Sequence, residues 1–394
     1  MKILVVCQYY KPEPFRVADI CEALAAQGHA VTVVTGTPNY PEGAIYPGYE
    51  GTAHRDEIVN GVRVHRCPIH PRKRGALHRF WNYYSFVFAS GRYLSRLEED
   101  FDVVLVNQLS PVMMAEGALD WAKRHGKKTV LYCLDLWPES LTAGGIRPGS
   151  LIYRVFWYIS RRIYRRADAI AVTSQGFEDY FRTALKLPDA KLEYLPQYAE
   201  GLFDRLPDAS PHPGVFNAVF AGNIGEMQAV ETIVEAAGKL AVRPDIHFHI
   251  VGDGVGLDAC RRLAEGLSNV TFYGRRDVSE MPGFYALADV MLVTLKADPV
   301  LSLTLPGKVQ SYLAAGKPVV GAINGETAAV VADADCGVCV AAEDAAALAD
   351  ALVSLADAPE RLREYGANAR RYYEAHFQKD AFLRKLTDVL KENC

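Results

Sequence analysis

The chain has 394 residues, of which 50% are hydrophobic and 23% charged, and 43 Lys and Arg nearly balance 47 Asp and Glu for a formal net charge of -4. This length and apolar content predict two domains with separate cores, and they exclude a disordered chain or a small disulfide scaffold. A net charge so close to zero produces no overall attraction to nucleic acid, although local patches of positive and negative charge can still cancel in the sum.

Neither a membrane span nor secretion is expected. No run reaches about 18 apolar residues, and the opening MKILVVCQYYKPEP reads as a strand and a Pro-rich loop, not as a signal peptide. The eight cysteines are scattered, as in a protein with reduced thiols. Cys336 and Cys339 form an isolated CxxC, and the acidic triplets at 100–102 and 333–335 match a metal–sugar motif only by chance, so no metal site is predicted.

Residues 1–198 are expected to form the first domain. Short β-rich runs alternate with helical patterns, which is typical of a parallel sheet covered by helices. A hairpin is predicted over 57–67, because Asn60-Gly61 suits the two positive φ angles of a type I′ turn. The other predicted strands cover residues 2–7, 30–35, 102–107, 128–133 and 168–173.

A Pro-rich segment from Leu195 to Phe216 is expected to link the first domain to a second one over 199–374. Strand patterns then resume at 217–223, 246–251, 269–274, 289–295, 317–323 and 337–340, and the closing helix at 375–394 is expected to pack back on the first domain. Open α/β sheets bind ligands beyond the carboxyl ends of their strands. The strand-end loops of both domains are therefore expected to line a shared cleft.

Glycines and lysines of the second domain indicate a phosphate site. The loop at 8–14 lacks the G-x-G-x-x-G fingerprint, which argues against a dinucleotide dehydrogenase. Glycines instead follow successive strands of the second domain, and together they favour close approach of a ligand to the backbone. Pro306 suits the first turn of a helix whose amides would welcome a phosphate. Lys296 and Lys308 would add mobile positive charge, although each could equally be a solvated surface lysine.

These motifs carry a resemblance to a known family. FAGNIG, VGDG and FYG, together with PGKVQSYLAAGKPVV, resemble the donor domain of glycosyltransferase family 4. In the first half, GHAVTVVTGTPNYPEG, DLWPESL and TSQGF are similar to its bacterial surface-polysaccharide branch, related to colanic acid and O-antigen transferases. The resemblance implies an α/β protein with the GT-B fold, in which two Rossmann-like domains face each other across a cleft. It also implies a retaining, metal-independent transfer of a sugar from a nucleotide diphosphate.

Two features of the family are absent from this sequence. The family carries two Glu residues separated by seven positions, and Leu303 and Ser311 stand there instead. The Arg and Lys that bind the diphosphate after the first donor strand correspond to Asn223 and Gln228. Neutralising the leaving diphosphate is therefore expected to depend on Lys296, Lys308 and helix-terminal amides.

The resemblance and the strand-end positions together give the candidate site residues. Asp135 and Glu139 of DLWPES, with Lys308, are expected to be catalytic, the carboxylates by orienting the acceptor hydroxyl or supporting charge on the sugar. Asp135 could instead cap a turn, and Glu139 could form a structural ion pair. The acceptor-side candidates are Glu13, Arg16 and Asn39. The donor-binding candidates are Gly222, Asn223, Gly225, Gly252, Gly274, Arg275, Lys296, Ser302, Lys308, Gln310 and Glu326.

A basic, aromatic-rich stretch lies in the first half. No acidic residue falls between Glu57 and Glu98, and aromatic residues alternate with arginines at 78–96 and again at 151–166. Both segments read as basic amphipathic helices that suit an anionic leaflet, each cation contributing about 1 kcal/mol near the surface. Ordinary helices with a solvated basic face are an alternative, and no nucleic acid partner is expected. The candidate membrane residues are Arg79, Trp81, Arg154, Trp157, Arg161 and Arg162.

The sequence therefore favours a cytoplasmic glycosyltransferase that is peripheral on the inner face of the cytoplasmic membrane. We expect it to move a sugar of the N-acetylhexosamine type from a UDP-sugar to a polyprenyl-diphosphate-linked glycan, with retention and without a cofactor. Its expected partners are the UDP-sugar, the lipid-linked acceptor and the anionic membrane surface. Two alternatives stay open: a nucleotide-sugar 2-epimerase, and a non-catalytic sugar-nucleotide-binding scaffold.

Overall fold

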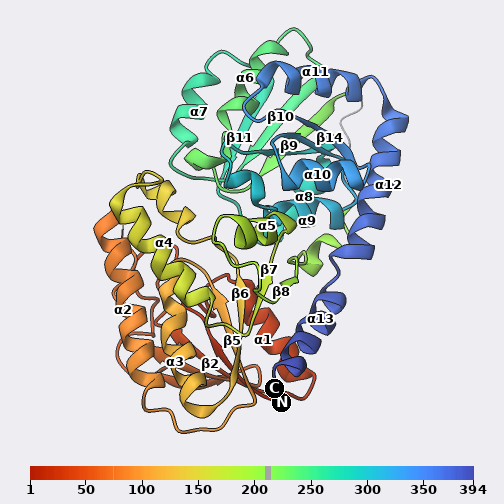
Figure 1. Cartoon of the computed structure of the whole chain (residues 1–394). Helices are drawn as coiled ribbons and strands as arrows, with labels where there is room; N and C mark the ends of the chain where they lie inside the picture. The colour runs from red at the N-terminus through yellow and green to blue at the C-terminus, as the bar shows by residue number, and fades with distance from the viewer. Residues whose placement is uncertain (74, 209–213) are drawn as a thin grey trace. The chain divides into compact units, whose positions relative to one another are not determined.

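The computed structural model describes residues 1–73, 75–208 and 214–394, which form two compact units (Figure 1). Arg74 of the basic stretch and two linker prolines lie outside the described residues. Unit 1 comprises Met1–Thr173, Phe177–Leu195 and Leu383–Cys394, and unit 2 comprises Ser174–Gly176 and Pro196–Phe382. The chain thus passes between the units near residues 195 and 382, close to the domain boundaries expected at 198 and 374.

Unit 1 is built on an eight-stranded sheet in the order β3-β4-β2-β1-β5-β6-β7-β8, in which only β3 is antiparallel to its neighbour. Its central strands are buried on both faces, because parallel strands covered by helices need near-continuous apolar runs. The strands are β1 (Lys2–Val6), β2 (Ala30–Gly36), β3 (Asp56–Val59), β4 (Val62–Cys67), β5 (Val103–Gln108), β6 (Lys128–Cys133), β7 (Ala169–Val172) and β8 (Leu192–Tyr194).

The predicted hairpin is confirmed: β3 and β4 pair antiparallel around Asn60 (φ 50°) and Gly61 (φ 82°). Strand β8 is not among the predicted strands, because its three residues are too few to show a periodic pattern.

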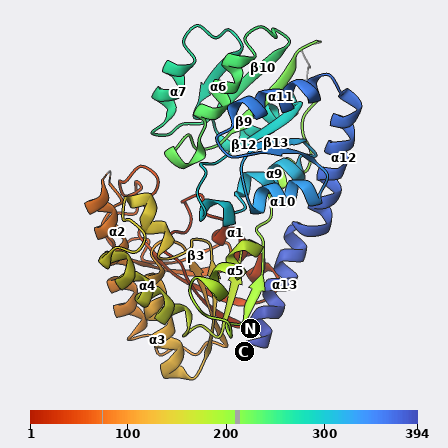
Figure 2. The same ribbon diagram turned by 45° about the horizontal axis from the view of Figure 1, so that its top comes forward.

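Helices cover both faces of this sheet, and α2 and α4 lie side by side on one flank of unit 1 (Figures 1 and 2). The helices are α1 (Arg16–Ala26), α2 (Ala76–Leu94), η1 (Val112–Ala115), α3 (Glu116–His125), η2 (Glu139–Gly144), α4 (Leu151–Tyr164), α5 (Gln175–Thr183) and the end of α13 (Lys379–Glu392). Near the termini, Lys191 pairs with Glu392 at 2.9 Å, and the Cys394 Sγ lies 3.3 Å from the Met1 Sδ.

Unit 2 contains a six-stranded parallel sheet in the order β11-β10-β9-β12-β13-β14. Its strands are β9 (Phe216–Ala221), β10 (Ile246–Val251), β11 (Val270–Gly274), β12 (Val290–Thr294), β13 (Val319–Ala322) and β14 (Gly337–Val340). Its helices are η3 (Gly201–Phe203), η4 (Glu226–Gln228), α6 (Glu231–Lys239), α7 (Leu257–Leu263), η5 (Val278–Glu280), α8 (Met281–Leu287), η6 (Leu301–Leu303), α9 (Gly307–Ala314), α10 (Glu326–Asp333), α11 (Ala345–Ala356) and α12 (Pro359–His376).

Alternate residues of the unit 2 strands feed two separate apolar layers. Phe220 and Leu292 belong to one core cluster, whereas Val219 and Met291, their neighbours in sequence, belong to the other. This two-layer core confirms the predicted α/β class.

Strand order places a reversal at the centre of each sheet. In unit 2, β9 has β10 on one side and β12 on the other, and in unit 1, β1 lies between β2 and β5. Such switch points leave a crevice beyond the carboxyl ends of the strands, where α/β proteins bind ligands. The loops that follow β9 and β1 are therefore the first places to look for a site.

Candidate active site

The loop after β9 lies against the lysine expected to bind a phosphate. Gly222 has φ 148°, and a β-carbon added there would lie 2.7 Å from the Nζ of Lys308. Lys308 reaches this point from α9, which begins at Gly307 directly after Pro306. Glycine is thus required at position 222 both by its backbone angle and by the space that the lysine occupies.

The ammonium group of Lys308 is buried and has no hydrogen-bond partner among the described residues, although the residue as a whole is only half-buried. Its Nζ lies 3.9 Å from the centroid of the Phe220 ring. Burial lowers the pKa of Lys308 from its usual 10.5 to about 7. Because an unpaired charge is costly in such surroundings, the site is suited to an anion that would pair with it.

Backbone-to-backbone packing fixes the loop around Gly222. The Gly222 N–H donates to the Val251 carbonyl (2.9 Å), and the Ile224 N–H donates to the Asp253 carbonyl (2.9 Å). A β-carbon on Gly252 would lie 1.8 Å from the Gly222 oxygen. The loops after β9 and β10 are therefore in direct main-chain contact.

Asn223 and Gln228, at the two positions that correspond to Arg and Lys in the family that the sequence resembles, are hydrogen-bonded to each other through their side chains. The Asn223 Nδ2 donates to the Gln228 Oε1 at 3.0 Å. Both amides lie beside Gly225, where an added β-carbon would meet the Gln228 oxygen at 2.5 Å. Asn223, Gly225 and Gln228 thus form a neutral polar rim next to the charged Lys308.

Other donor-side candidates occupy separate positions in unit 2. Lys296 and Arg275 are exposed, and Gly274 (φ 67°) has open space around it. The Ser302 hydroxyl donates to the Pro299 carbonyl (2.7 Å), and the buried Gln310 amide nitrogen faces the Pro306 carbonyl (3.0 Å). The structure therefore brings Gly222, Asn223, Gly225, Gly252 and Lys308 together, and the Gly252 N–H donates to the carbonyl of a further candidate, Gly274, at 2.9 Å.

The carboxylate of Glu326 is hydrogen-bonded to main-chain amides. It accepts hydrogen bonds from the Gln175 N–H (2.9 Å) and the Gly176 N–H (3.1 Å), at the start of α5. This is the favourable place for a carboxylate at a helix N-terminus.

Sequence reasoning missed one carboxylate on the donor side. The Ser311 hydroxyl, which stands at one of the family's Glu positions, donates to the Glu200 Oε2 at 3.3 Å. Glu200 comes from the segment that precedes η3 and lies more than a hundred positions from Ser311 in sequence. No local motif could therefore predict this contact.

Asp135 follows β6 in unit 1, and its carboxylate accepts hydrogen bonds from Ser110. Its Oδ2 accepts from the Ser110 N–H (3.0 Å) and the Ser110 hydroxyl (2.9 Å), which also accepts from the Trp137 indole (2.9 Å). Desolvation raises the pKa of Asp135 and outweighs these hydrogen bonds. Asp135 is thus a carboxyl group whose charged form is only partly compensated by the protein.

Glu139 is buried and accepts hydrogen bonds from two tyrosine hydroxyls. Tyr180 donates to its Oε1 at 2.6 Å, and Tyr153 donates to the same oxygen. The structure therefore ties η2 to α4 and α5 through this one carboxylate.

The acceptor-side candidates hold the strand-end loops of unit 1. The buried Glu13 accepts from the Asn39 and Tyr40 N–H groups, both at 2.8 Å, and desolvation raises its pKa to about 7. The Asn39 Oδ1 in turn accepts from the Arg72 N–H at 2.7 Å. Arg16 is the first residue of α1. Glu13 and Asn39 thus join the loops after β1 and β2 to the segment that leads into α2.

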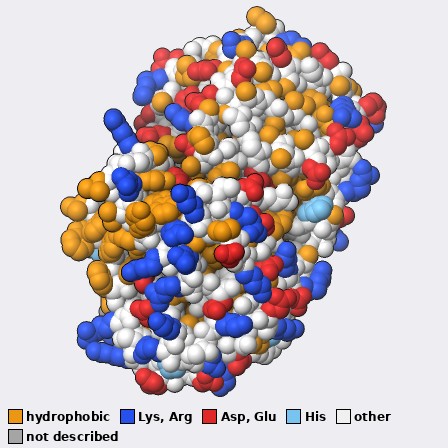
Figure 3. Space-filling model, in the orientation of Figure 1, with side chains coloured by type: hydrophobic (Ala, Val, Ile, Leu, Met, Phe, Trp, Pro, Cys, Tyr) orange, Lys and Arg blue, Asp and Glu red, His pale blue; other side chains and the backbone are white. Residues whose placement is uncertain are grey.

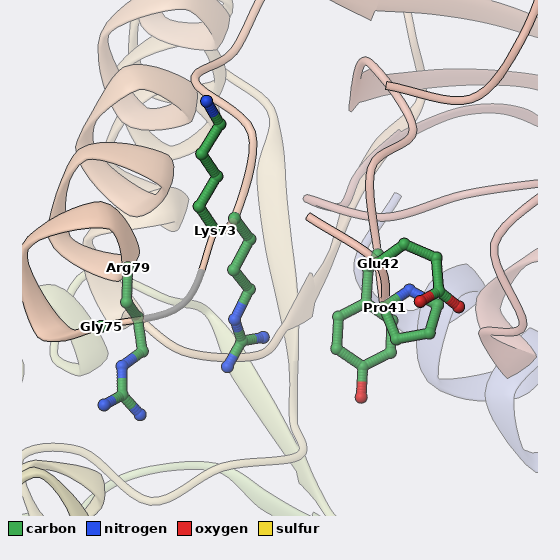
Figure 4. Close-up of a pocket in the computed structure, with 7 residues that line it drawn as sticks. Pro41, Glu42, Lys73, Gly75 and Arg79 are labelled. Atoms are coloured by element: carbon green, nitrogen blue, oxygen red, sulfur yellow. The ribbon is translucent and has the colours of Figure 1, made fainter. Parts of the chain in front are cut away.

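These joined loops border a pocket of about 300 Å³ in unit 1 (Figure 4). Three cationic side chains and one carboxylate are among its lining residues, which are Tyr40, Pro41, Glu42, Arg72, Lys73, Gly75 and Arg79. Sequence reasoning assigned Arg79 to a membrane surface and did not predict this pocket, because its walls are some 30 positions apart in sequence.

Large apolar side chains are exposed on α2 and α4. These two helices carry eight of the thirteen exposed large hydrophobic residues among those described. They follow helical spacing, which places each set on one face. Figure 3 shows hydrophobic side chains gathered over α2 and α4, with Lys and Arg side chains beside them. The eight exposed residues are Leu77, Phe80, Trp81, Phe88, Leu151, Ile152, Val155 and Tyr158; we call this set the apolar face.

Several of the predicted membrane residues make contacts within unit 1. The Trp157 indole donates to the Ala184 carbonyl (3.1 Å), Arg161 donates to the Leu185 carbonyl (3.0 Å), and Arg162 pairs with Glu116. Arg154 and Trp81 are exposed. Within the described ranges, no helix is both long and apolar enough to cross a bilayer.

Comparison with family models now identifies the chain. A "Glycosyl transferase 4-like domain" model matches residues 15–197, and a "Glycosyl transferases group 1" model matches residues 216–358. The chain belongs to glycosyltransferase family 4. This glycosyltransferase is 26% identical over 414 residues to a protein described as a colanic acid biosynthesis glycosyl transferase, WcaI of Escherichia coli (strain K12), with 99% of this chain and 100% of that protein covered.

Solved structures are similar in fold to this glycosyltransferase over nearly its whole length. A sucrose-phosphate synthase from Thermosynechococcus elongatus matches with a TM-score of 0.75 and 18% identity, covering 99% of this chain and 98% of that chain. Anabaena Alr3699/HepE, solved in complex with UDP, matches with a TM-score of 0.71 and 15% identity, covering all of both chains. At these identities the likeness concerns the fold, and the predicted GT-B fold is confirmed.

Proposed function

We propose that this glycosyltransferase is a retaining, metal-independent enzyme that transfers a sugar from a UDP-sugar to a polyprenyl-diphosphate-linked glycan in bacterial surface-polysaccharide synthesis. A sugar of the N-acetylhexosamine type is the proposed donor sugar. The full-length likeness to WcaI supports the polysaccharide context, and the UDP complex of Alr3699/HepE supports a uridine nucleotide. The single observation that carries the proposal is the buried ammonium of Lys308 at the switch point of the unit 2 sheet, for which the described residues supply no hydrogen-bond acceptor.

Lys308 has the chemistry that departure of a diphosphate requires. As the bond between the sugar and the diphosphate breaks, negative charge grows on the leaving group. A cation already desolvated and aimed at that group stabilises this charge without solvent reorganisation. In this proposal Lys308 supplies the charge that the family's Arg and Lys provide elsewhere, while Asn223 and Gln228 contribute neutral hydrogen bonds.

Glu200 is proposed to supply a carboxylate that the sequence motif lacks. It lies at hydrogen-bonding distance from Ser311, which occupies one of the family's Glu positions. A carboxylate there would accept a hydrogen bond from a ribose hydroxyl of the nucleotide, as Asp and Glu commonly do in nucleotide-binding folds.

The apolar face is proposed to rest on an anionic membrane. Exposed Leu77, Trp81 and Phe88 on α2, and Leu151 and Tyr158 on α4, offer area whose burial in the interfacial region is favourable. Neighbouring arginines would add electrostatic attraction to acidic lipid. Such docking would bring the acceptor-side loops to a lipid-linked substrate.

A transfer assay tests the proposed function directly. The enzyme is incubated with UDP-N-acetylglucosamine and a synthetic prenyl-diphosphate-linked monosaccharide, and product is followed by chromatography and its anomeric configuration by NMR. Transfer with retained configuration supports the proposal, and an inverted product would refute the retaining mechanism. Incubation with the donor alone detects a 2-epimerase, which needs no acceptor.

The Asn223–Gln228 pair, standing where charged residues are expected, favours one other function, a non-catalytic sugar-nucleotide-binding scaffold. Tight binding of UDP-sugars without transfer to any of a panel of lipid-linked acceptors would support that function instead.

A further inference from the structure

We propose that the pocket lined by residues 40–42, 72, 73, 75 and 79 binds the diphosphate group of the lipid-linked acceptor, an inference that rests on the proposed function. Arg72, Lys73 and Arg79 line the pocket against a single carboxylate, Glu42. No acidic side chain pairs with Lys73 or Arg79 among the described residues. The pocket therefore carries an excess of positive charge that a compact dianion would neutralise.

Arg72 is held in place before any ligand arrives. Its guanidinium carbon lies 5.4 Å from the Tyr40 ring centroid and 5.6 Å from the Tyr83 ring centroid. Its Nη1 also donates to the Tyr9 hydroxyl at 3.4 Å. A guanidinium fixed between aromatic rings loses little conformational freedom on binding, and its planar fork matches phosphate oxygens.

The start of α2 adds further donors on the same side of the pocket. Gly75 caps this 19-residue helix with φ 102°, and among the described residues no side chain caps its first amides. No acidic residue lies in the first turn. The free N–H groups and the positive end of the helix dipole therefore favour an anion where Arg79 also lies.

The opposite wall is rigid. Glu13 holds the Asn39 and Tyr40 amides, and a β-carbon on Gly43 (φ 71°) would lie 2.5 Å from the Arg72 carbonyl oxygen. Figure 4 shows Arg79 across the pocket from Pro41 and Glu42, and Lys73 between them with its amine turned away from Arg79. Arg72 and Arg79 are thus expected to make the main contacts, with Lys73 contributing its charge by reorienting.

The apolar face decides which anion fits. Leu77, Phe80 and Trp81 are exposed within the first turns of α2, next to the residues of the pocket. A ligand with a charged diphosphate and a long apolar chain could therefore place its diphosphate in the pocket and its apolar chain on the exposed residues of α2. The pocket volume of about 300 Å³ is small for a nucleotide sugar but suits a diphosphate.

The test measures binding of farnesyl diphosphate to the full chain by calorimetry, with farnesyl phosphate, farnesol and inorganic pyrophosphate as comparison ligands. Arg79→Gln is expected to weaken farnesyl diphosphate binding by about 10-fold or more, as loss of a charged hydrogen bond does. Lys73→Gln is expected to have a smaller effect, and the double variant a larger one. Arg92→Gln, an exposed arginine near the other end of α2, is the matched control and should bind as the parent does. Thermal unfolding of every variant confirms that it is folded.

Three outcomes would overturn the proposal. The first is equal binding by the Arg79→Gln and Arg92→Gln variants. The second is equal affinity for farnesyl diphosphate and farnesol, which would mean that only the apolar chain is recognised. The third is loss of binding to phosphatidylglycerol vesicles by Arg79→Gln with unchanged farnesyl diphosphate affinity, which would make the pocket a site for a membrane lipid. UDP-sugar affinity and sugar transfer are measured separately, so failure of the proposed function is distinguished from failure of the pocket.

Discussion

Replacing Lys308 by methionine tests the central feature of the donor site. Methionine preserves the length and apolar stem of the side chain but removes the buried ammonium, which has no hydrogen-bond partner among the described residues and lies beside Gly222. Two effects of opposite sign are expected. The free protein should become more stable, because an uncompensated buried charge is removed, and donor binding should weaken, because the diphosphate loses its cation.

The stability effect depends on pH, and its sign follows from the lowered pKa. Burial lowers the pKa of Lys308 from 10.5 to about 7, so the unfolded chain binds more protons between these values. The cost is therefore fully present below pH 7 and disappears as the pH rises towards 10.5. At about 1.4 kcal/mol per pKa unit the upper limit is on the order of 5 kcal/mol. We expect Lys308→Met to raise the free energy of unfolding by roughly 2–4 kcal/mol at pH 6 and by little at pH 10.

Donor affinity depends on pH in the opposite direction from stability, because it falls as the pH rises above 7. A bound diphosphate pairs with the ammonium and raises its pKa, so donor binding to the parent protein is coupled to proton uptake above pH 7. The dissociation constant of a UDP-sugar should rise by up to about tenfold per pH unit above that point and stay constant below it. In the Lys308→Met variant it should be about 30-fold to several thousand-fold higher at pH 6.5, since losing one partner of a buried charge pair costs about 2–5 kcal/mol.

Calorimetric titration from pH 6 to 8.5 and urea unfolding provide the two measurements. A UDP-sugar is preferred to UDP, because its diphosphate diester does not titrate in this range. Lys239→Met, which removes an exposed lysine of the same unit, is the control and should change neither quantity appreciably. A pH-independent affinity in the parent, together with unchanged affinity in Lys308→Met, would falsify the assigned role of Lys308.

Three further predictions follow from other parts of the molecule. Glu200→Gln should weaken UDP binding by about 3- to 30-fold, measured by calorimetry, because a hydrogen bond to a charged acceptor contributes about 1.5–3 kcal/mol and one to the neutral amide that replaces it about 0.5–1.5 kcal/mol. Equal affinity would exclude the proposed ribose contact. Glu139→Gln should lower the free energy of unfolding by about 1–3 kcal/mol in urea while the folded enzyme keeps its turnover; lost turnover at full stability would make Glu139 catalytic instead. Trp81→Ser with Phe88→Ser should reduce sedimentation with phosphatidylglycerol vesicles, and Ile58→Ser, an exposed apolar residue on β3, should not; equal behaviour of the two variants would remove the apolar face from membrane binding.

The strands and the hairpin could be predicted because their signals are local. A run such as residues 103–106 needs only its own apolar composition to become a buried parallel strand, and Asn60-Gly61 needs only its own backbone preferences to turn a hairpin. The meeting of Gly222 and Lys308 could also be foreseen, because strand-end loops of a parallel sheet gather at one edge.

Contacts between distant segments could not be predicted in the same way. Glu200 beside Ser311, and the pocket between residues 40–42 and 72–79, depend on chain segments whose proximity no local pattern encodes. Glu139 shows the same limit: nothing in DLWPES indicates that Tyr153 and Tyr180 donate hydrogen bonds to its carboxylate.

Charge shows most clearly how folding changes what a sequence count means. The basic stretch without local acids is partly neutralised by residues far from it, since Arg63 pairs with Glu99 and Arg162 with Glu116. In the part of the chain that the structure describes, Arg79 and Arg154 keep no acidic partner. The positive charge that survives these pairings therefore includes residues at the start of α2 and on α4, the two helices that expose the apolar face. Because paired arginines contribute little field beyond their partners, a membrane or a prenyl diphosphate would respond to this remaining charge and not to the total number of arginines.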